Sequence, residues 1–249
     1  VGKRIMNIIV PNFTTSQSLR HSLARGLATQ AFYIAKKNGA NLERLFKSAF
    51  ELNPNIKSHA RIAKRIKSEN GVVSSTVCSK DGLGLRVIFR GGLIAKTYSN
   101  DQEIFEEQSV VYTMINLRHM KNGIEINALR VIYSKHALVR FVTRTNTSLN
   151  ATLLETLDRE AVASLTQLSN NSLKGNDLES YPIAKQFDGL WPSEIVETTG
   201  EDGWPKDKQG STPKIRTLRV RTFLSPEEMS GGIYLIWKGD PKLSYSKSA

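Results

Sequence analysis

The sequence predicts an α+β fold in which a basic helical N-terminal part is followed by helices packed on a mainly antiparallel sheet. Two observations lead to this class. Apolar residues recur at three- and four-residue steps through most of residues 15–69, whereas runs of β-branched residues broken by glycines follow. The change occurs without a visible linker. We therefore divide the chain into a basic helical region, residues 1–70, and an α+β domain, residues 71–249, and keep a single continuous domain open as the alternative.

Helical periodicity in the basic region predicts three helices. Asn-Gly pairs follow the first and third of them, and a proline follows the second, and such residues end helices. The predicted ranges are Thr15–Lys37, Asn41–Leu52 and Ile56–Glu69.

The segment after Gly71 predicts short strands joined by glycine turns, one of them Arg90-Gly91-Gly92. Residues 101–120 fit either a helix or a strand, and residues 169–212 fit loops with short elements. The remaining expected strands are Val72–Cys78, Leu83–Phe89, Leu93–Tyr98, Leu129–Tyr133, Arg216–Phe223 and Ile233–Trp237, and the remaining helices begin near Ser134 and span Asn150–Leu168.

Positive charge is concentrated at the N-terminal end. The chain of 249 residues carries a net charge of +12, and residues 1–70 hold 13 Lys and Arg against three acidic residues. Clustered cations release counterions from a phosphate backbone when they bind it, so this asymmetry predicts a polyanionic partner. The alternative is a solvated basic surface that keeps the protein soluble.

The third predicted helix carries the clearest cationic stripe. Its basic residues share one face, while Ile62 and Ile66 lie on the opposite side, a shape that can lie along phosphates. A helix-turn-helix over residues 41–70 is a further possibility. An anionic membrane ranks lower because the helix lacks tryptophan, and we expect no membrane partner. The predicted nucleic-acid-binding residues are Arg20, Arg25, Lys57, Arg61, Lys64 and Arg65.

Several common enzyme classes lack their motifs in this chain. It contains no phosphate-binding glycine loop, no dinucleotide fingerprint, no His-Glu-x-x-His and no Gly-x-Ser-x-Gly, so we expect no cofactor and no metal. The single cysteine, Cys78, excludes an internal disulfide and fits a reducing, cytoplasmic compartment. The first residues lack a small-residue cleavage site, which argues against a signal peptide.

A second candidate site lies on the helix that begins near Ser134. There, His136, Arg140 and Arg144 are spaced four apart and form one stripe. A histidine that is uncharged can act as a base, and two arginines can hold a phosphate and stabilise its transition state. These groups suffice for metal-free RNA cleavage. The alternative is that His136 caps the helix and the arginines are solvated or pair with acidic residues.

The run Ser134-x-His136-Ala137-x-x-Arg140 resembles the Ser-x-His-Ala-x-x-Arg motif of small bacterial toxin-like domains, which look related to compact α+β ribonuclease toxins. The resemblance implies catalytic roles for His136 and Arg140, and less directly for Arg144. It also implies partner proteins of a toxin-antitoxin-like complex. The chain departs from the pattern after the helix, where Thr145 and Asn146 replace the usual Gly-Ile.

Two functions of different class follow. The first is a nucleic-acid-binding protein that grips RNA or DNA phosphates through its basic helical face. The alternative is a metal-independent ribonuclease, a bacterial toxin or defence effector, that uses the stripe of His136, Arg140 and Arg144. A subunit of a larger nucleoprotein assembly is a weaker third possibility.

Overall fold

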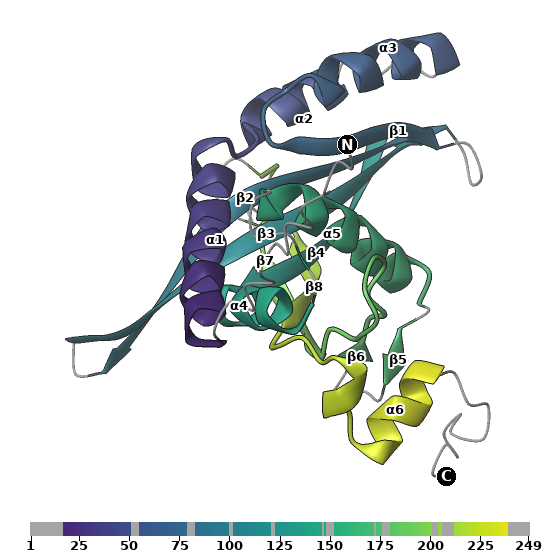
Figure 1. Ribbon diagram of the computed structural model, residues 1–249. Helices are drawn as coiled ribbons and strands as arrows, with labels where there is room; N and C mark the ends of the chain where they lie inside the picture. The colour runs from purple at the N-terminus through teal and green to yellow at the C-terminus, as the bar shows by residue number, and fades with distance from the viewer. Residues whose placement is uncertain are drawn as a thin grey trace, which may run out of the picture.

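The computed structural model describes residues 17–50, 55–78, 83–99, 102–120, 123–145, 147, 152–171, 173–175, 180–200, 204–205 and 212–238. The α+β class is confirmed: three helices precede a mainly antiparallel sheet, and further helices pack on that sheet (Figure 1). The segment considered for a signal peptide lies outside the described residues. Among the described helices, none combines the length and apolar character needed to cross a bilayer.

The described helices are α1 (Gln17–Lys37), α2 (Leu42–Phe50), α3 (Ile56–Lys67), α4 (Lys135–Arg144), α5 (Leu153–Ser169), the 3-10 helix η1 (Pro226–Glu228) and α6 (Gly231–Lys238). The strands are β1 (Val72–Cys78), β2 (Gly84–Ser99), β3 (Gln102–Met120), β4 (Gly123–Ser134), β5 (Lys174–Gly175), β6 (Ser180–Tyr181), β7 (Ser193–Thr199) and β8 (Lys214–Val220). Their order in the sheet is β1-β2-β3-β4-β8-β7-β6-β5, and β4 and β8 form the parallel pair.

The sheet is covered on both faces because successive side chains of a strand point to opposite sides. Even-numbered residues of β3, such as Tyr112 and Met114, join α1, α4 and α5 in one buried cluster. Odd-numbered neighbours, such as Ile115 and Leu117, join α2 and α3 in a second cluster on the other face. The N-terminal helices therefore contribute to both clusters that the sheet builds.

Helix α1 approaches the sheet closely through small side chains. Ala24, Ala28, Ala31 and Ala35 recur along one face of the helix and are almost completely buried. Opposite the end of that face, a Cβ atom on Gly92 would lie 2.7 Å from the Lys36 Cβ, closer than carbon atoms can pack. Glycine is thus required at position 92 by the passing helix.

The predicted turn at Arg90-Gly91-Gly92 is wrong, because Gly92 makes room for helix α1 and does not end a strand. Strand β2 runs without interruption from Gly84 to Ser99, and its residues pair with β3 through this region. Glycines inside a strand can signal a close backbone approach instead of a turn. Residues 102–120, which fit a helix or a strand, form strand β3.

The predicted last strand, Ile233–Trp237, is also wrong, because this segment forms helix α6. Branched and aromatic residues favour strands, but a strand also needs a neighbour to pair with. The preceding strand β8 is already paired on both sides, by β4 and by β7. A helix satisfies its backbone hydrogen bonds internally, and α6 lies at the end of the molecule where β5 and β6 are drawn, away from the long strands β2 and β3 (Figure 1).

Candidate nucleic-acid interface and histidine cavity

Helix α3 divides cleanly into an apolar and a charged side. Ile62, Ala63 and Ile66 are buried in the second cluster, against the sheet. The N-cap of the helix is Asn55, whose side chain accepts a hydrogen bond from the Lys57 backbone nitrogen at 2.8 Å. The opposite side is exposed and is called here the cationic face; it consists of Lys57, Arg61, Lys64, Arg65 and Lys67.

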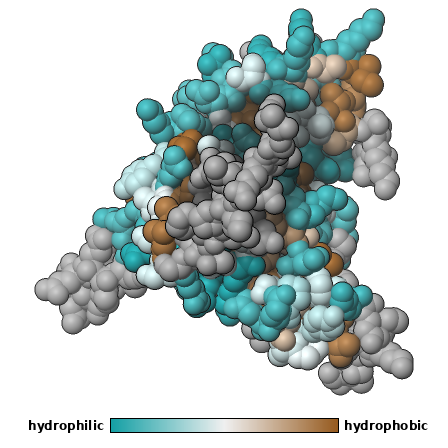
Figure 2. All heavy atoms as spheres, viewed as in Figure 1, coloured by the Kyte–Doolittle hydropathy of each residue, from teal (hydrophilic) through white to brown (hydrophobic). Residues whose placement is uncertain are grey.

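The acidic residue nearest in sequence does not neutralise this face. Glu69, just beyond the helix, forms an ion pair with Arg44 at 3.1 Å. Among the described residues, no ion pair holds Lys57, Arg61 or Lys64. Hydrophilic side chains gather at the end of the molecule where α3 lies, at the top of the view in Figure 2. The cationic face is therefore available to a polyanion.

The two predicted arginines of α1 have different positions. Arg20 lies against the end of α4, where its guanidinium donates hydrogen bonds to the carbonyl oxygens of Val142 at 3.0 Å and Thr145 at 2.5 Å. Val142 lies in the last turn of α4 and Thr145 is its C-cap, and this end of a helix attracts cations. Arg20 thus joins α1 to α4, whereas Arg25 is exposed and lines a cavity described below.

Helix α4 forms as predicted, with Ser134 at its N-cap accepting a hydrogen bond from the Ala137 backbone nitrogen at 3.2 Å. Ala137 and Phe141 are fully buried, while His136 and Arg140 are exposed on the other side. The sequence stripe of one histidine and two arginines therefore exists on the helix, but its members have different surroundings.

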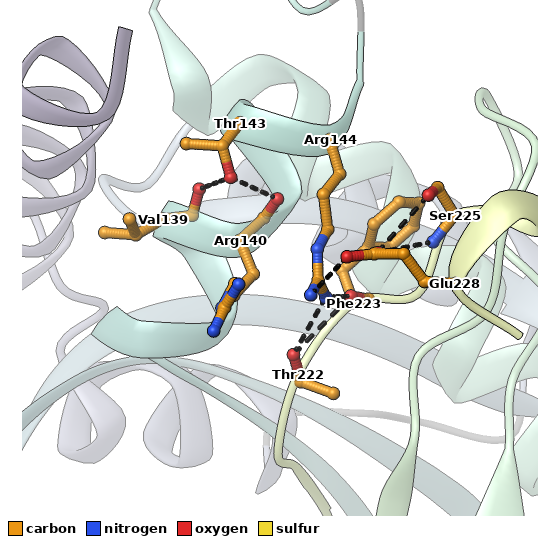
Figure 3. Close-up of polar contacts among 8 residues, drawn as sticks. All are labelled: Val139, Arg140, Thr143, Arg144, Thr222, Phe223, Ser225 and Glu228. Atoms are coloured by element: carbon orange, nitrogen blue, oxygen red, sulfur yellow. Dashed lines mark hydrogen bonds and ion pairs between the residues drawn. The ribbon is translucent and has the colours of Figure 1, made fainter. Parts of the chain in front are cut away.

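Arg144, at the end of the stripe, is bound into the fold. Its guanidinium forms an ion pair with Glu228 at 2.6 Å and donates to the Phe223 carbonyl oxygen and, at 3.4 Å, to the Thr222 hydroxyl (Figure 3). Glu228 also accepts from Ser225, so the carboxylate joins η1 to α4. Burial lowers the pKa of Arg144, while Glu228 acts in the opposite direction.

His136 instead lies in a cavity of about 410 Å³ between α1, β3 and α4, which we call the histidine cavity. A second histidine, His21, comes to the same cavity from α1. No spacing rule connects the two residues, since they lie on helices far apart in the sequence. The lining residues are His21, Arg25, Glu106, Glu107, Gln108, Lys135, His136 and Val139.

The contacts around the cavity come from three elements. The Lys135 ammonium reaches the Gln108 side-chain oxygen of β3 at 3.5 Å, and Ser109 pairs with Ser134 in the sheet. The β3–β4 pairing therefore places the start of α4 beside residues 106–108 of β3. Arg20 fixes α1 to the other end of α4, and His21, the next residue of α1, lines the cavity.

Arg219 of β8 and Arg221 just after it are paired with an acidic residue. Glu194 of β7 forms ion pairs with Arg219 at 3.1 Å and with Arg221. The hydrogen bond from Arg221 is the main cause that lowers the pKa of Glu194, although partial burial acts against it. Both arginines therefore have a structural partner, Glu194, on the neighbouring strand β7.

In the part of the chain that the structure describes, no three His, Cys, Asp or Glu side chains form a cluster that could hold a metal ion. Comparisons of this chain with protein-family models, with curated proteins and with solved structures found no match.

Proposed function

We propose that this protein binds nucleic acid through the cationic face of α3. The observation that supports the proposal is the exposure of five basic side chains on one side of a single helix, whose other side is anchored to the sheet. A helix held in this way presents its cations along one side of an ordered backbone, so only the side chains must be ordered on binding. Phosphates would occupy that row and release their counterions.

The proposed ligand is either RNA or DNA, because both present the phosphates that the cationic face would contact. Contacts to phosphates carry no sequence information, so no base sequence is specified. We also propose a cytoplasmic location, which the single cysteine favours.

The test is a gel-shift titration of RNA and of DNA over a range of salt concentrations. It compares the wild type with the double variant Arg61→Glu/Lys64→Glu. We expect the variant to bind roughly tenfold or more weakly near 0.15 M salt, and the slope of log affinity against log salt to fall by about 2.

The matched control is Lys214→Glu/Arg216→Glu, which makes the same change of charge at exposed positions of β8. We expect it to bind nearly as well as the wild type. Equal losses in both double variants would show that net charge alone attracts the nucleic acid, and this would contradict the proposed interface. Thermal unfolding of each variant checks that the fold is retained.

A second candidate function, RNA cleavage, is favoured by one observation, which is that His21 and His136 line the same cavity. The stripe expected from the sequence supports it less, because Arg144 is engaged by Glu228 and the Phe223 carbonyl.

A further inference from the structure

We infer that the histidine cavity cleaves single-stranded RNA, and that His21 and His136 are its pair of proton-transfer groups. The inference rests on the proposed nucleic-acid binding, since the cationic face of α3 would supply the affinity. It differs from the stripe expected on α4, because the second reactive group comes from α1 and not from further along the same helix.

The cavity is lined by two histidines and by two basic side chains. Both histidines are exposed, so each can reach a bound substrate and exchange protons with it. Arg25 and Lys135 line the same cavity and can contact a phosphate. Two imidazoles and two cations, one of each from α1 and one of each from α4, thus line one cavity, and Arg20 ties α1 to the far end of α4.

Two imidazoles meet the requirements of one reaction in particular. One accepts the proton of a ribose 2′-hydroxyl, and the 2′-oxygen then attacks the adjacent phosphorus. The bond from phosphorus to the 5′-oxygen breaks, and the other imidazole, protonated, gives its proton to that oxygen. The products are a 2′,3′-cyclic phosphate and a 5′-hydroxyl end, and no oxidant, reductant or further reactant is consumed. DNA lacks the 2′-hydroxyl, so RNA is the substrate class.

The remaining charged groups of the cavity shape its pH dependence. Glu106 and Glu107 of β3 line the cavity along with Arg25 and Lys135, and the alternation of strand side chains puts Glu106, not Glu107, on the sheet face that carries α1 and α4. Glu106 is exposed and lies opposite Lys96 in the β2–β3 pairing, which places a cation beside it. Because one imidazole must be neutral and the other protonated, we expect a bell-shaped profile of cleavage rate against pH.

The experiment incubates the full chain with a single-stranded RNA oligonucleotide in EDTA and analyses the ends of any fragments. The variants are His21→Gln, His136→Gln and the double variant, with Gln30→Ala of α1, which does not line the cavity, as the matched control. We expect 2′,3′-cyclic phosphate ends from the wild type and the control, and a rate roughly a hundredfold lower in each single variant. A 2′-O-methyl RNA of the same sequence should stay intact.

Each single variant should also lose one limb of the pH profile, a change that a merely structural role would not produce. The inference is overturned if the wild type yields no fragments, or if the double variant cuts as fast as the wild type, which would indicate a contaminating nuclease. Gel shifts of the 2′-O-methyl RNA separate the two proposals. A salt-sensitive shift without cleavage would support the nucleic-acid interface and contradict RNA cleavage in the histidine cavity. Cleavage without that shift would support the catalytic cavity and contradict the interface on α3.

Discussion

Helices α3 and α4 both carry basic residues at helical spacing, yet the structure uses these residues differently. On α3 the cations form an exposed face, and the acidic residue nearest in sequence, Glu69, is engaged by Arg44. On α4 the last arginine, Arg144, is an internal link whose side chain is 16% exposed and whose partner, Glu228, comes from η1. A partner distant in sequence makes this difference, so spacing along a helix cannot by itself distinguish a binding cation from a structural one.

The largest effect on stability is expected at Arg144. The variant Arg144→Met leaves Glu228 and the Phe223 carbonyl without their charged donor. We expect the free energy of unfolding to fall by about 2 kcal/mol, which corresponds to roughly 5 °C in Tm for a chain of this size. Urea unfolding measures the change.

The neighbouring Arg140→Met is the control for this comparison, because Arg140 is exposed on the same helix. Its effect on the free energy of unfolding should stay within about 0.5 kcal/mol. Equal losses in the two variants would mean that Arg144 has no special structural role.

A somewhat smaller effect is expected at Arg20, which links α1 to the end of α4. Replacing it with methionine leaves the Val142 and Thr145 carbonyls without their charged donor, and this should cost about 1.5 kcal/mol of unfolding free energy. Arg25→Met, five residues further along α1, should leave stability nearly unchanged, because Arg25 is exposed. Thermal unfolding of the two variants side by side tests whether only the first arginine is structural.

The smallest effect concerns Glu194 and its arginines. Its pKa is lowered in the folded state, chiefly by the hydrogen bond from Arg221, so its contribution to stability is present above the pKa of the unfolded chain. That contribution is lost as the pH falls through the lower, folded-state pKa. Glu194→Gln should therefore be less stable than the wild type at pH 7, by under about 1 kcal/mol because the arginines are exposed.

Urea unfolding at pH 7 and pH 3 measures this prediction. The difference between wild type and variant should shrink at the lower pH, since protonation removes the charge that the variant lacks. A difference that is the same at both pH values would show that the ion pairs add no net stability.

Much of the secondary structure could be predicted because it depends on local patterns. The three N-terminal helices, strand β1 and the start of α4 at Ser134 lie close to their predicted bounds. The errors arose where a distant contact overrode the local signal. Gly91 and Gly92 were interpreted as a turn because glycine pairs are a local turn signal. The actual reason for Gly92, the close approach of α1, cannot be seen in the neighbouring sequence. The segment of α6 resembled a strand because its residues favour one, although β8 is paired on both sides.

The candidate site shows the same division. His136 could be selected from its helix alone, but His21 could not, since the two residues come to line one cavity only after α1 packs against α4. A sequence pattern reports neighbours within a few residues on one element. It carries no information on which helix will cover which face of a sheet, and that packing assembles the cavity.

The sequence by itself determined the fold class, the placement of basic charge at the N-terminal end, and the two-sided character of α3, because periodicity and composition are properties of local chain segments. The tertiary structure alone decided which cations stay exposed on α3, which arginines become links at Arg20 and Arg144, and which histidines share a cavity. These outcomes depend on contacts between elements, and the physical reason is that burial and pairing are set by whatever packs nearby in space.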